Sequence, residues 1–438
     1  MAGGTDLARA LEAIVGTEHV RPGEAAPAYA VDEQAAPLVA FPGSVEEVSR
    51  VLALAWDRRL GVVPAGAGTR LGWGGTPRRL DLVLALRRLD RVLAHEPADL
   101  TLSVEAGVTL GALNARLSTH HQFVPLDPAR ADGSTMGGLV ATAASGPYRA
   151  RYGTMRDLLL GVTAVQADGT VIKGGGRVVK NVTGYDIPKL FVGSLGTLGV
   201  VVEAHLRVHP MPAEEATWVF GFPSAEVALE AALTLHDTAV LPSRLQLVDR
   251  GTLAALGEPG PPGAALAVAV GSVPAAVRAQ GARVAEICRR GGGEALAIAD
   301  ASRWWTAVSD AAWATEPATT VLLRVGTRPS DVVKALRAGE AALPEAARLR
   351  ATAEVANGVL HVVIGGVAAG AVAGLTERVR GDVTSLLATC VVEHAPPRAK
   401  PGLDVWGSAG TALATMRQLK DEFDARGVLN PGRFVGGI

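Results

Sequence analysis

Apolar and polar positions in the first half of the chain alternate in short blocks, each long enough for one strand or one helix. Residues 35–68 give an apolar run, a Pro-Gly turn, an amphipathic stretch and a second apolar run, which predicts strand, helix and strand. Ser44, with Glu47 three residues later, is typical of a capping box at the start of that helix. The segments "LDLVLAL" and "LTLSVEAG" predict further strands, and Thr109 or a neighbour caps the short helix after them.

Later blocks predict a hairpin, a domain boundary and a second domain. Asp168 and Gly169 join two apolar runs, a pairing that favours the tight turn of a β-hairpin. The alternating segment that follows stops at Pro210 and Pro212, which mark the best boundary in the chain. Strand, turn and amphipathic helix then recur, which indicates an α+β or βαβ sheet backed by helices. A last helix is expected to end at Gly427, before a Pro-Gly tail.

Composition narrows the class of protein. The 438 residues predict two or three domains, and 48% hydrophobic with 19% charged residues favours a well-buried enzyme. Because 42 basic residues balance 43 acidic ones, charge gives no reason to expect nucleic acid or an anionic membrane as partner. Cys288 and Cys390 are the only cysteines, which excludes a disulfide framework or a Cys-based cluster and favours a reducing cytoplasm. The most apolar windows are broken by Gly and Pro and are too short for a transmembrane segment.

Four Gly-rich segments are candidates for ligand binding. The first, "GVVPAGAGTRLGWGG" (61–75), lacks the Lys and Ser/Thr of a P-loop, and Leu71 stands where a Rossmann loop needs its third glycine. The others are 125–146, 146–153 and 180–210. In these, backbone could approach a ligand closely, but each segment alone also fits tight packing.

Taken in this order, the four segments resemble the FAD-binding domain of the vanillyl-alcohol oxidase and para-cresol methylhydroxylase (PCMH) superfamily. "GSLGTLGVVVEAHLRVHP" is similar to its "GSEGTLG" segment, and "RGVLNPGRF" to its terminal "NPGK" motif. "VVKNVTGYDIPKLFVGSLGTLGV" most resembles the branch of the glycolate oxidase FAD-binding subunit and its D-lactate and D-2-hydroxyacid dehydrogenase relatives. The likeness covers about residues 35–212 and returns at 419–435. It implies an α+β fold: a two-part PCMH-type FAD-binding domain (1–212), a ferredoxin-like α+β cap (213–400), and a C-terminal helix and tail (401–438) that return to the FAD domain.

The resemblance also implies which residues bind FAD. The loop from Pro64 to Arg70 would hold the pyrophosphate through backbone amides, which suits a Gly-rich concavity. Non-covalent FAD is expected, because this loop contains neither His nor Cys. The implied cofactor-binding residues are Pro64, Ala65, Gly66, Ala67, Gly68, Thr69 and Arg70; Asp127, Pro128, Gly133, Ser134, Thr135, Gly137, Gly138 and Ala141 along the flavin and ribityl chain; Gly196, Thr197, Gly199 and Val200 near the adenine side; and Asn430 and Arg433 reaching back towards the flavin.

Catalytic residues are implied in the cap. Arg324 matches a position used for the substrate carboxylate, and His361, Glu393 and His394 match parts of two histidine-containing segments. A hydroxy acid needs a cation for its carboxylate and a base for its hydroxyl proton. Glu354, where the relatives carry a histidine, could join His361 and His394 as metal ligands, or these residues could be leftovers of an eroded motif. No metal is counted among the predicted cofactors.

The resemblance implies oxidation of a small 2-hydroxy acid, glycolate or D-lactate, by the FAD-binding subunit of a glycolate oxidase-type complex. The partners would be a homologous flavin subunit and an iron–sulfur subunit, with no nucleic acid and no membrane span. A cytoplasmic location is expected, at most peripheral to the inner membrane through these partners. Two alternatives remain: a stand-alone D-2-hydroxyacid dehydrogenase, and a non-catalytic assembly subunit that contains flavin.

Overall fold

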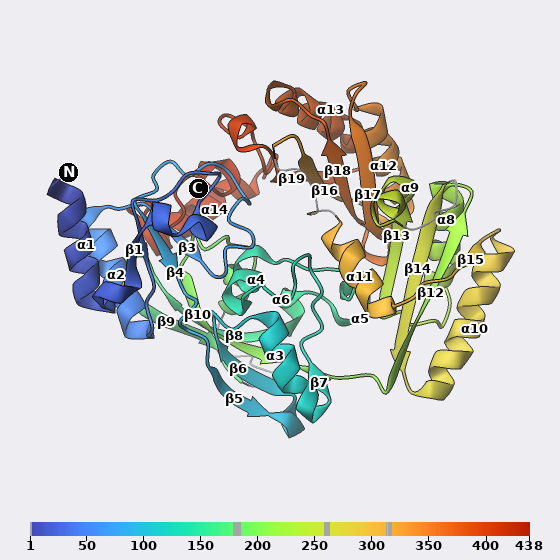
Figure 1. Ribbon diagram of the computed structural model, residues 1–438, viewed down its shortest axis with the longest axis horizontal. Helices are drawn as coiled ribbons and strands as arrows, with labels where there is room; N and C mark the ends of the chain where they lie inside the picture. The colour runs from blue at the N-terminus through green and yellow to red at the C-terminus, as the bar shows by residue number, and fades with distance from the viewer. Residues whose placement is uncertain (1, 178–184, 258–262, 312, 314–317) are drawn as a thin grey trace.

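The computed structural model describes residues 2–177, 185–257, 263–311, 313 and 318–438. Two lobes lie side by side, with the N-terminal half of the chain in one and residues from 214 onward in the other (Figure 1). The C-terminal helix and tail return to the first lobe. The segment 180–184, part of the motif that most resembles the glycolate oxidase branch, lies outside the described residues.

The first lobe begins with a small four-stranded sheet. Its order is β1 (Val20–Pro22), β2 (Leu38–Ala40), β4 (Leu82–Ala85), β3 (Val62–Ala65), parallel from β2 to β3 and antiparallel at β1. Helices α1 (Ala2–Val15) and α2 (Val45–Arg58) pack on it around a core that includes Leu52 and Leu84. The predicted cap of α2 is confirmed, since the Ser44 hydroxyl accepts the amide N–H of Glu47 at 3.1 Å.

An antiparallel five-stranded sheet forms the rest of this lobe. Its order is β5 (Val92–Glu96), β6 (Thr101–Glu105), β10 (Val200–Arg207), β8 (Leu159–Val165), β9 (Val171–Gly175). The β8–β9 pairing confirms the predicted hairpin, and Gly169 adopts the positive φ of 91° that its turn needs. The remaining elements are α3 (Leu110–Leu117), α4 (Met136–Thr142), α5 (Arg149–Tyr152), α6 (Met155–Leu158) and α7 (Pro188–Phe191), with a two-stranded pair of β7 (Gln122–Phe123) and β11 (His209–Pro210).

The second lobe contains two consecutive β-α-β-β-α-β units, each with ferredoxin-like strand order. The first unit comprises β12 (Glu214–Phe222), α8 (Ala225–His236), β13 (Arg244–Asp249), α9 (Arg250–Ala255), β14 (Ala264–Ser272), α10 (Pro274–Arg290) and β15 (Glu294–Leu296). After α11 (Ala301–Asp310), the second comprises β16 (Val321–Gly326), α12 (Val332–Ala341), β17 (Arg348–Glu354), β18 (Val359–Gly365), α13 (Val372–Thr384) and β19 (Thr389–His394). Antiparallel pairing of β13 with β17 joins both units into one eight-stranded sheet. The predicted α+β fold with a ferredoxin-like cap is therefore confirmed, and the cap is a double unit.

Side-chain alternation gives this sheet two different faces. On β16, Val321, Leu323 and Val325 are buried in the large core beneath α8, α10, α12 and α13. Leu322 and Arg324 point the other way, towards the first lobe, because successive residues of a strand face opposite sides. One face of the sheet is thus a helix-covered core. The other face carries a second apolar cluster beneath α9 and α11 in the first unit, and polar groups such as Arg324 and His361 in the second.

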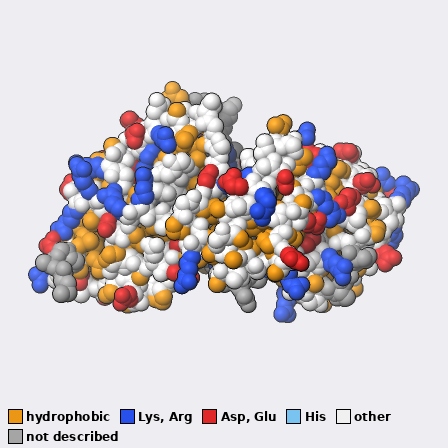
Figure 2. Space-filling view, turned by 90° about the horizontal axis from the view of Figure 1, so that it is seen from above, with side chains coloured by type: hydrophobic (Ala, Val, Ile, Leu, Met, Phe, Trp, Pro, Cys, Tyr) orange, Lys and Arg blue, Asp and Glu red, His pale blue; other side chains and the backbone are white. Residues whose placement is uncertain are grey.

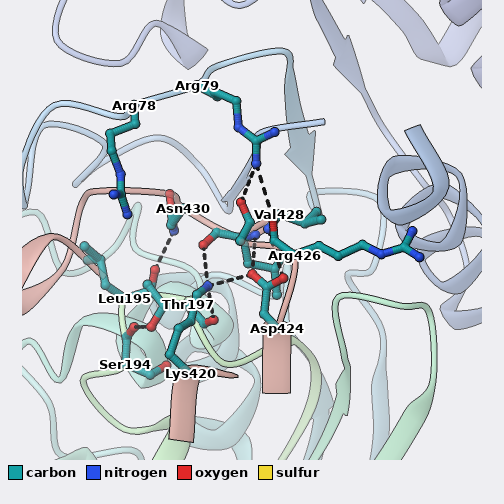
Figure 3. A network of polar contacts seen from close by, with 12 residues as sticks. Arg78, Arg79, Ser194, Leu195, Thr197, Lys420, Asp424, Arg426, Val428 and Asn430 are labelled. Atoms are coloured by element: carbon teal, nitrogen blue, oxygen red, sulfur yellow. Dashed lines mark hydrogen bonds and ion pairs between the residues drawn. The ribbon is translucent and has the colours of Figure 1, made fainter. Parts of the chain in front are cut away.

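The tail is anchored in the first lobe by a buried ion pair (Figure 3). After α14 (Ala412–Asp424), Leu429 pairs in parallel with Val62 of β3. The Lys420 ammonium group donates to Asp424 at 2.6 Å and to the carbonyls of Thr197 and Leu429 at 2.8 and 2.9 Å. The tail therefore extends the small sheet at the strand that precedes the opening Gly-rich loop.

The last helix ends earlier than predicted, at Asp424 rather than Gly427. The Asp424 carboxylate accepts the amides of Val428 and Leu429, at 2.9 and 2.7 Å, which turns the chain away from the helix axis. Among the described helices, none is both long and apolar enough to cross a membrane.

Replacing Lys420 with Met should destabilise the protein by about 3–5 kcal/mol, because it leaves the fully buried Asp424 carboxylate without its charge partner. Thermal unfolding measures this. The matched control is Glu286→Gln, which removes a carboxylate paired on the surface with Arg283 and should leave the melting temperature nearly unchanged. Equal effects of the two changes would contradict the anchoring role of Lys420.

Candidate active site

A cavity of about 350 Å³ lies between the two lobes. One wall is the polar face of the eight-stranded sheet, and the other is built from loops and short helices of the first lobe. From above, acidic and basic side chains lie next to one another near the junction of the lobes (Figure 2). The charged and aromatic residues that line the cavity are Arg70, Trp73, Asp127, Arg149, Arg156, Trp313, Arg324, Glu354, His361 and Glu393.

Three predicted catalytic residues are neighbours on adjacent strands of this wall. Arg324 is in register with His361, so both side chains point into the cavity. The Glu393 carboxylate accepts Arg324 Nε at 2.7 Å and lies 3.7 Å from Nε2 of His361. Burial lowers the pKa of His361, partly opposed by the Glu393 charge, so the imidazole is neutral near pH 7. The arrangement offers a fixed cation beside a neutral base.

His394 is the exception among the predicted catalytic residues, since it does not line the cavity. A register shift between β16 and β19 places His394 opposite Leu322, one residue past Glu393. There its ring packs against Trp313, with centroids 6.3 Å apart. The structure therefore separates His394 from the Arg324, His361 and Glu393 group.

The possible metal set of Glu354, His361 and His394 is not brought together. Glu354 lies 3.5 Å from Nε of Arg149, and His361 faces Glu393. No group of three or more His, Cys, Asp or Glu side chains suited to a metal ion occurs in the described part of the chain.

Two further carboxyl groups are buried where the lobes meet. Desolvation raises the pKa of Glu354 to about 7, despite the opposing charge of Arg149. Desolvation likewise raises the pKa of Asp127 to about 6, against the charge of Arg244, whose Nε lies 3.1 Å away. Arg244 also lies over the ring of Tyr148, 3.7 Å from its centroid. Each pair joins one lobe to the other.

The opening Gly-rich loop follows β3 and borders a second, smaller cavity of about 70 Å³. We call residues 66–70 the cofactor loop. Among the described residues, its backbone N–H groups find no protein acceptor. A Cβ on Gly66 would lie 1.9 Å from Oγ1 of Thr135, so this position accepts only glycine. Unpaired amides in a Gly-rich concavity fit the pyrophosphate of FAD.

Most of the predicted cofactor-binding residues line this smaller cavity: Pro64, Ala65, Gly66, Ala67, Gly68, Thr69, Arg70, Ser134, Thr135, Gly138, Ala141, Asn430 and Arg433. Asp127 and Pro128 instead line the larger cavity, and Gly133 borders a third one of about 200 Å³ beside them. The sequence did not single out Leu195 and Thr142, which also lie on the wall of the smaller cavity.

The remaining cofactor predictions lie away from these cavities. Gly137 packs against Ala106, where a Cβ would approach to 2.7 Å. Gly199 packs beside Phe191, and its neighbour Val200 is buried in the core. Gly196 and Thr197 lie against the tail, near Asn430 and Lys420 respectively. In this structure these residues hold the first lobe and its tail together.

Arg433 lines the smaller cavity, and its guanidinium group also binds groups of the protein. Its guanidinium donates to Oδ1 of Asn430 at 3.1 Å and to the carbonyl of Trp73 at 2.5 Å. It is buried and therefore holds a neighbouring turn in place. Sequence reasoning also missed Arg149, Arg244 and Lys400; only Arg149 lies in a segment that had been singled out, "GPYRARYG".

Comparison with known families and proteins identifies the architecture. A family model described as "FAD binding domain" matches residues 36–175, and one described as "FAD linked oxidases, C-terminal domain" matches residues 211–434, half of the chain. The chain belongs to the FAD-linked oxidases. FAD is therefore the cofactor of this FAD-linked oxidase, as predicted, and the protein is an oxidoreductase of the predicted superfamily.

Individual relatives of this FAD-linked oxidase support the assignment. It is 30% identical over 429 residues to "Probable D-lactate dehydrogenase, mitochondrial" of Danio rerio, covering 91% of this chain and 84% of that protein. It is 34% identical over 216 residues to the glycolate oxidase subunit GlcD of Bacillus subtilis, covering 49% of this chain and 46% of the subunit. A p-cresol methylhydroxylase structure with substrate bound shares the fold, with a TM-score of 0.76, 15% identity and coverage of 99% and 97% of the two chains.

Gly66→Asp should abolish retention of FAD, because the side chain adds bulk against Thr135 and a negative charge beside the pyrophosphate. The ratio of flavin to protein absorbance after purification measures retention, and circular dichroism verifies folding. Gly176→Asp is the matched control, since it adds the same charged side chain where a Cβ would meet nothing within 4 Å. A folded Gly66→Asp protein with a full complement of flavin would contradict the placement of the pyrophosphate.

Glu354 should make stability depend on pH. Its pKa rises from a usual 4.5 to about 7 in the folded protein. Between pH 4.5 and pH 7 the folded protein therefore keeps a proton on Glu354 that the unfolded chain has released. The contribution of Glu354 to the free energy of unfolding therefore falls as the pH rises from 4.5 to 7. Glu354→Gln removes the effect, so the melting temperature of the variant relative to wild type should be higher at pH 8 than at pH 5. A difference independent of pH would show that Glu354 titrates normally.

Proposed function

We propose that the chain catalyses FAD-dependent oxidation of a small 2-hydroxy acid, of the glycolate or D-lactate class, to the 2-oxo acid. The observation that carries the proposal is the pairing of Arg324 with a neutral His361 on one wall of the cavity between the lobes. A carboxylate and a neighbouring hydroxyl on one small substrate match this cation and this base. Relatives named D-lactate dehydrogenase and glycolate oxidase subunit support the substrate class.

In this proposal the substrate carboxylate binds the guanidinium of Arg324, whose Nε is held by Glu393. Nε2 of His361 accepts the hydroxyl proton, and the Glu393 carboxylate 3.7 Å away stabilises the imidazolium that results. FAD, when bound, supplies the two-electron acceptor for the hydride of the adjacent carbon–hydrogen bond.

We further propose, as the finer assignment, that the chain is the FAD-binding subunit of a glycolate oxidase-type complex. A homologous flavin subunit and an iron–sulfur subunit would then be its partners, and non-covalent FAD its resident group. A stand-alone dehydrogenase is the second candidate, favoured by the presence of Arg324, His361 and Glu393 in one cavity of a single chain. A non-catalytic assembly subunit would leave that cavity without a role.

Arg324→Lys and His361→Asn should each lower kcat/KM for the hydroxy acid by at least about a hundredfold, a typical loss for a substrate clamp or a general base. His361→Asn should act on kcat, and Arg324→Lys more on KM. Rapid anaerobic reduction of the flavin measures both. Arg328→Lys and His236→Gln, at exposed positions of the same lobe, are the matched controls and should behave as wild type. Wild-type rates in both site variants would refute the proposed roles.

Anaerobic addition of glycolate and of D-lactate to the purified chain separates the candidates. Bleaching of the flavin by the chain alone indicates a stand-alone dehydrogenase. Bleaching or turnover only after partner subunits are added indicates the subunit of a complex. A complex whose turnover survives removal of this chain's flavin indicates an assembly role and would refute the proposed chemistry.

A further inference from the structure

The turn that follows the cofactor loop, residues 71–75, has every carbonyl oxygen bound by a cation from the C-terminal part of the chain. We call it the carbonyl turn. The buried guanidinium of Arg433 donates to the carbonyls of Leu71, Trp73 and Gly75, the last two at 2.5 and 3.4 Å. The amide of Gly75 donates back to the carbonyl of Arg433 at 2.9 Å. Arg433 thus binds the odd-numbered carbonyls.

Lys400 binds the even-numbered carbonyls of the same turn. Its buried ammonium group donates to the carbonyl of Gly72, to that of Gly74 at 3.3 Å, and to Oδ1 of Asp32 at 2.6 Å. The side chains of Lys400 and Asp32 are only 2% and 4% exposed. Two buried cations and one buried anion therefore leave one net positive charge against the turn.

We infer that Lys400 and Arg433 are positioning residues for FAD, which hold the carbonyl turn so that the amides of the cofactor loop face the pyrophosphate. Each peptide group is planar, so a bound carbonyl oxygen also fixes the direction of its peptide plane. Five successive oxygens bound by two cations therefore fix the path of the turn, and with it the direction of the N–H groups of the cofactor loop just before it. These N–H groups find no acceptor among the described residues, as an anion site requires. Arg433 also lines the cofactor cavity, so its charge favours an anion there.

Lys400 makes this positioning depend on the second lobe. It lies six residues after His394, the last residue of β19, and β19 carries Glu393 of the active-site cavity. The segment that follows β19 and its cavity residue Glu393 therefore leads to Lys400, whose ammonium group binds the carbonyl turn. The inference rests on FAD as cofactor and is independent of the substrate.

The test is the affinity of the apoprotein for FAD and for riboflavin, which lacks the pyrophosphate. Flavin fluorescence quenching gives both dissociation constants for Lys400→Met. We expect FAD binding to weaken by at least about tenfold, as for a lost hydrogen bond to a charged group, while riboflavin binding changes less than about twofold. Arg433→Lys, which keeps the charge but not the forked geometry, should weaken FAD binding in the same selective way.

Lys189→Met is the matched control, because Lys189 also donates to a backbone carbonyl, that of Leu159, but away from the cofactor loop. It should leave both constants unchanged. If Lys400→Met does not fold, the variant Asp32→Asn/Lys400→Met removes both charges of the buried pair and is measured instead. Selective loss of FAD affinity in the measured variant supports positioning. Wild-type FAD affinity, or equal weakening for both flavins, would overturn the inference and leave Lys400 a purely structural role.

Discussion

The return of the C-terminal tail to β3 is the constraint on which the site depends. Leu429 pairs with Val62, and β3 runs directly into the cofactor loop. The pairing is fixed by Lys420, a buried cation whose donors are shared among Asp424 and two backbone carbonyls. A glycine-rich loop has little side-chain packing of its own, so its shape must come from its neighbours. Residues more than 300 positions away supply that shape.

The second lobe places the proposed catalytic groups on strands rather than on a loop. Alternation along β16 and β18 sends Arg324 and His361 to the face opposite the helices, and antiparallel register sets them side by side. Rigid strands hold such groups more precisely than loops do. The register shift on β19 selects Glu393 for the site and places His394 beside Trp313. One unpaired residue in a strand therefore decides which member of the Glu-His pair lines the cavity.

Local patterns predicted local structure well. The cap at Ser44, the hairpin turn at Gly169 and the alternation of strands and helices after Pro212 follow from side-chain chemistry within a few residues, and the structure confirms them. The doubling of the ferredoxin-like unit was not seen, because its two halves share strand order rather than any motif. Contacts such as Arg149 with Glu354, or Lys400 with Gly72, join residues hundreds of positions apart and leave no local signal. The family motif led to Arg433, but only the structure shows which carbonyls it binds.

Two buried pairs of opposite charge join the lobes at their junction. A junction packed only by hydrophobic side chains would not respond to the charge of a ligand. Here each junction pair, Arg149–Glu354 and Arg244–Asp127, contains an acid whose ionisation is opposed by desolvation. Because the pKa values of these acids lie at about 7 and 6, small changes in local potential shift their protonation near neutral pH. An anion entering the cavity would raise both values further, since negative charge favours the neutral acid. In the proposed mechanism, a substrate carboxylate bound at Arg324 would therefore favour the protonated form of Glu354, which pairs with Arg149 of the first lobe.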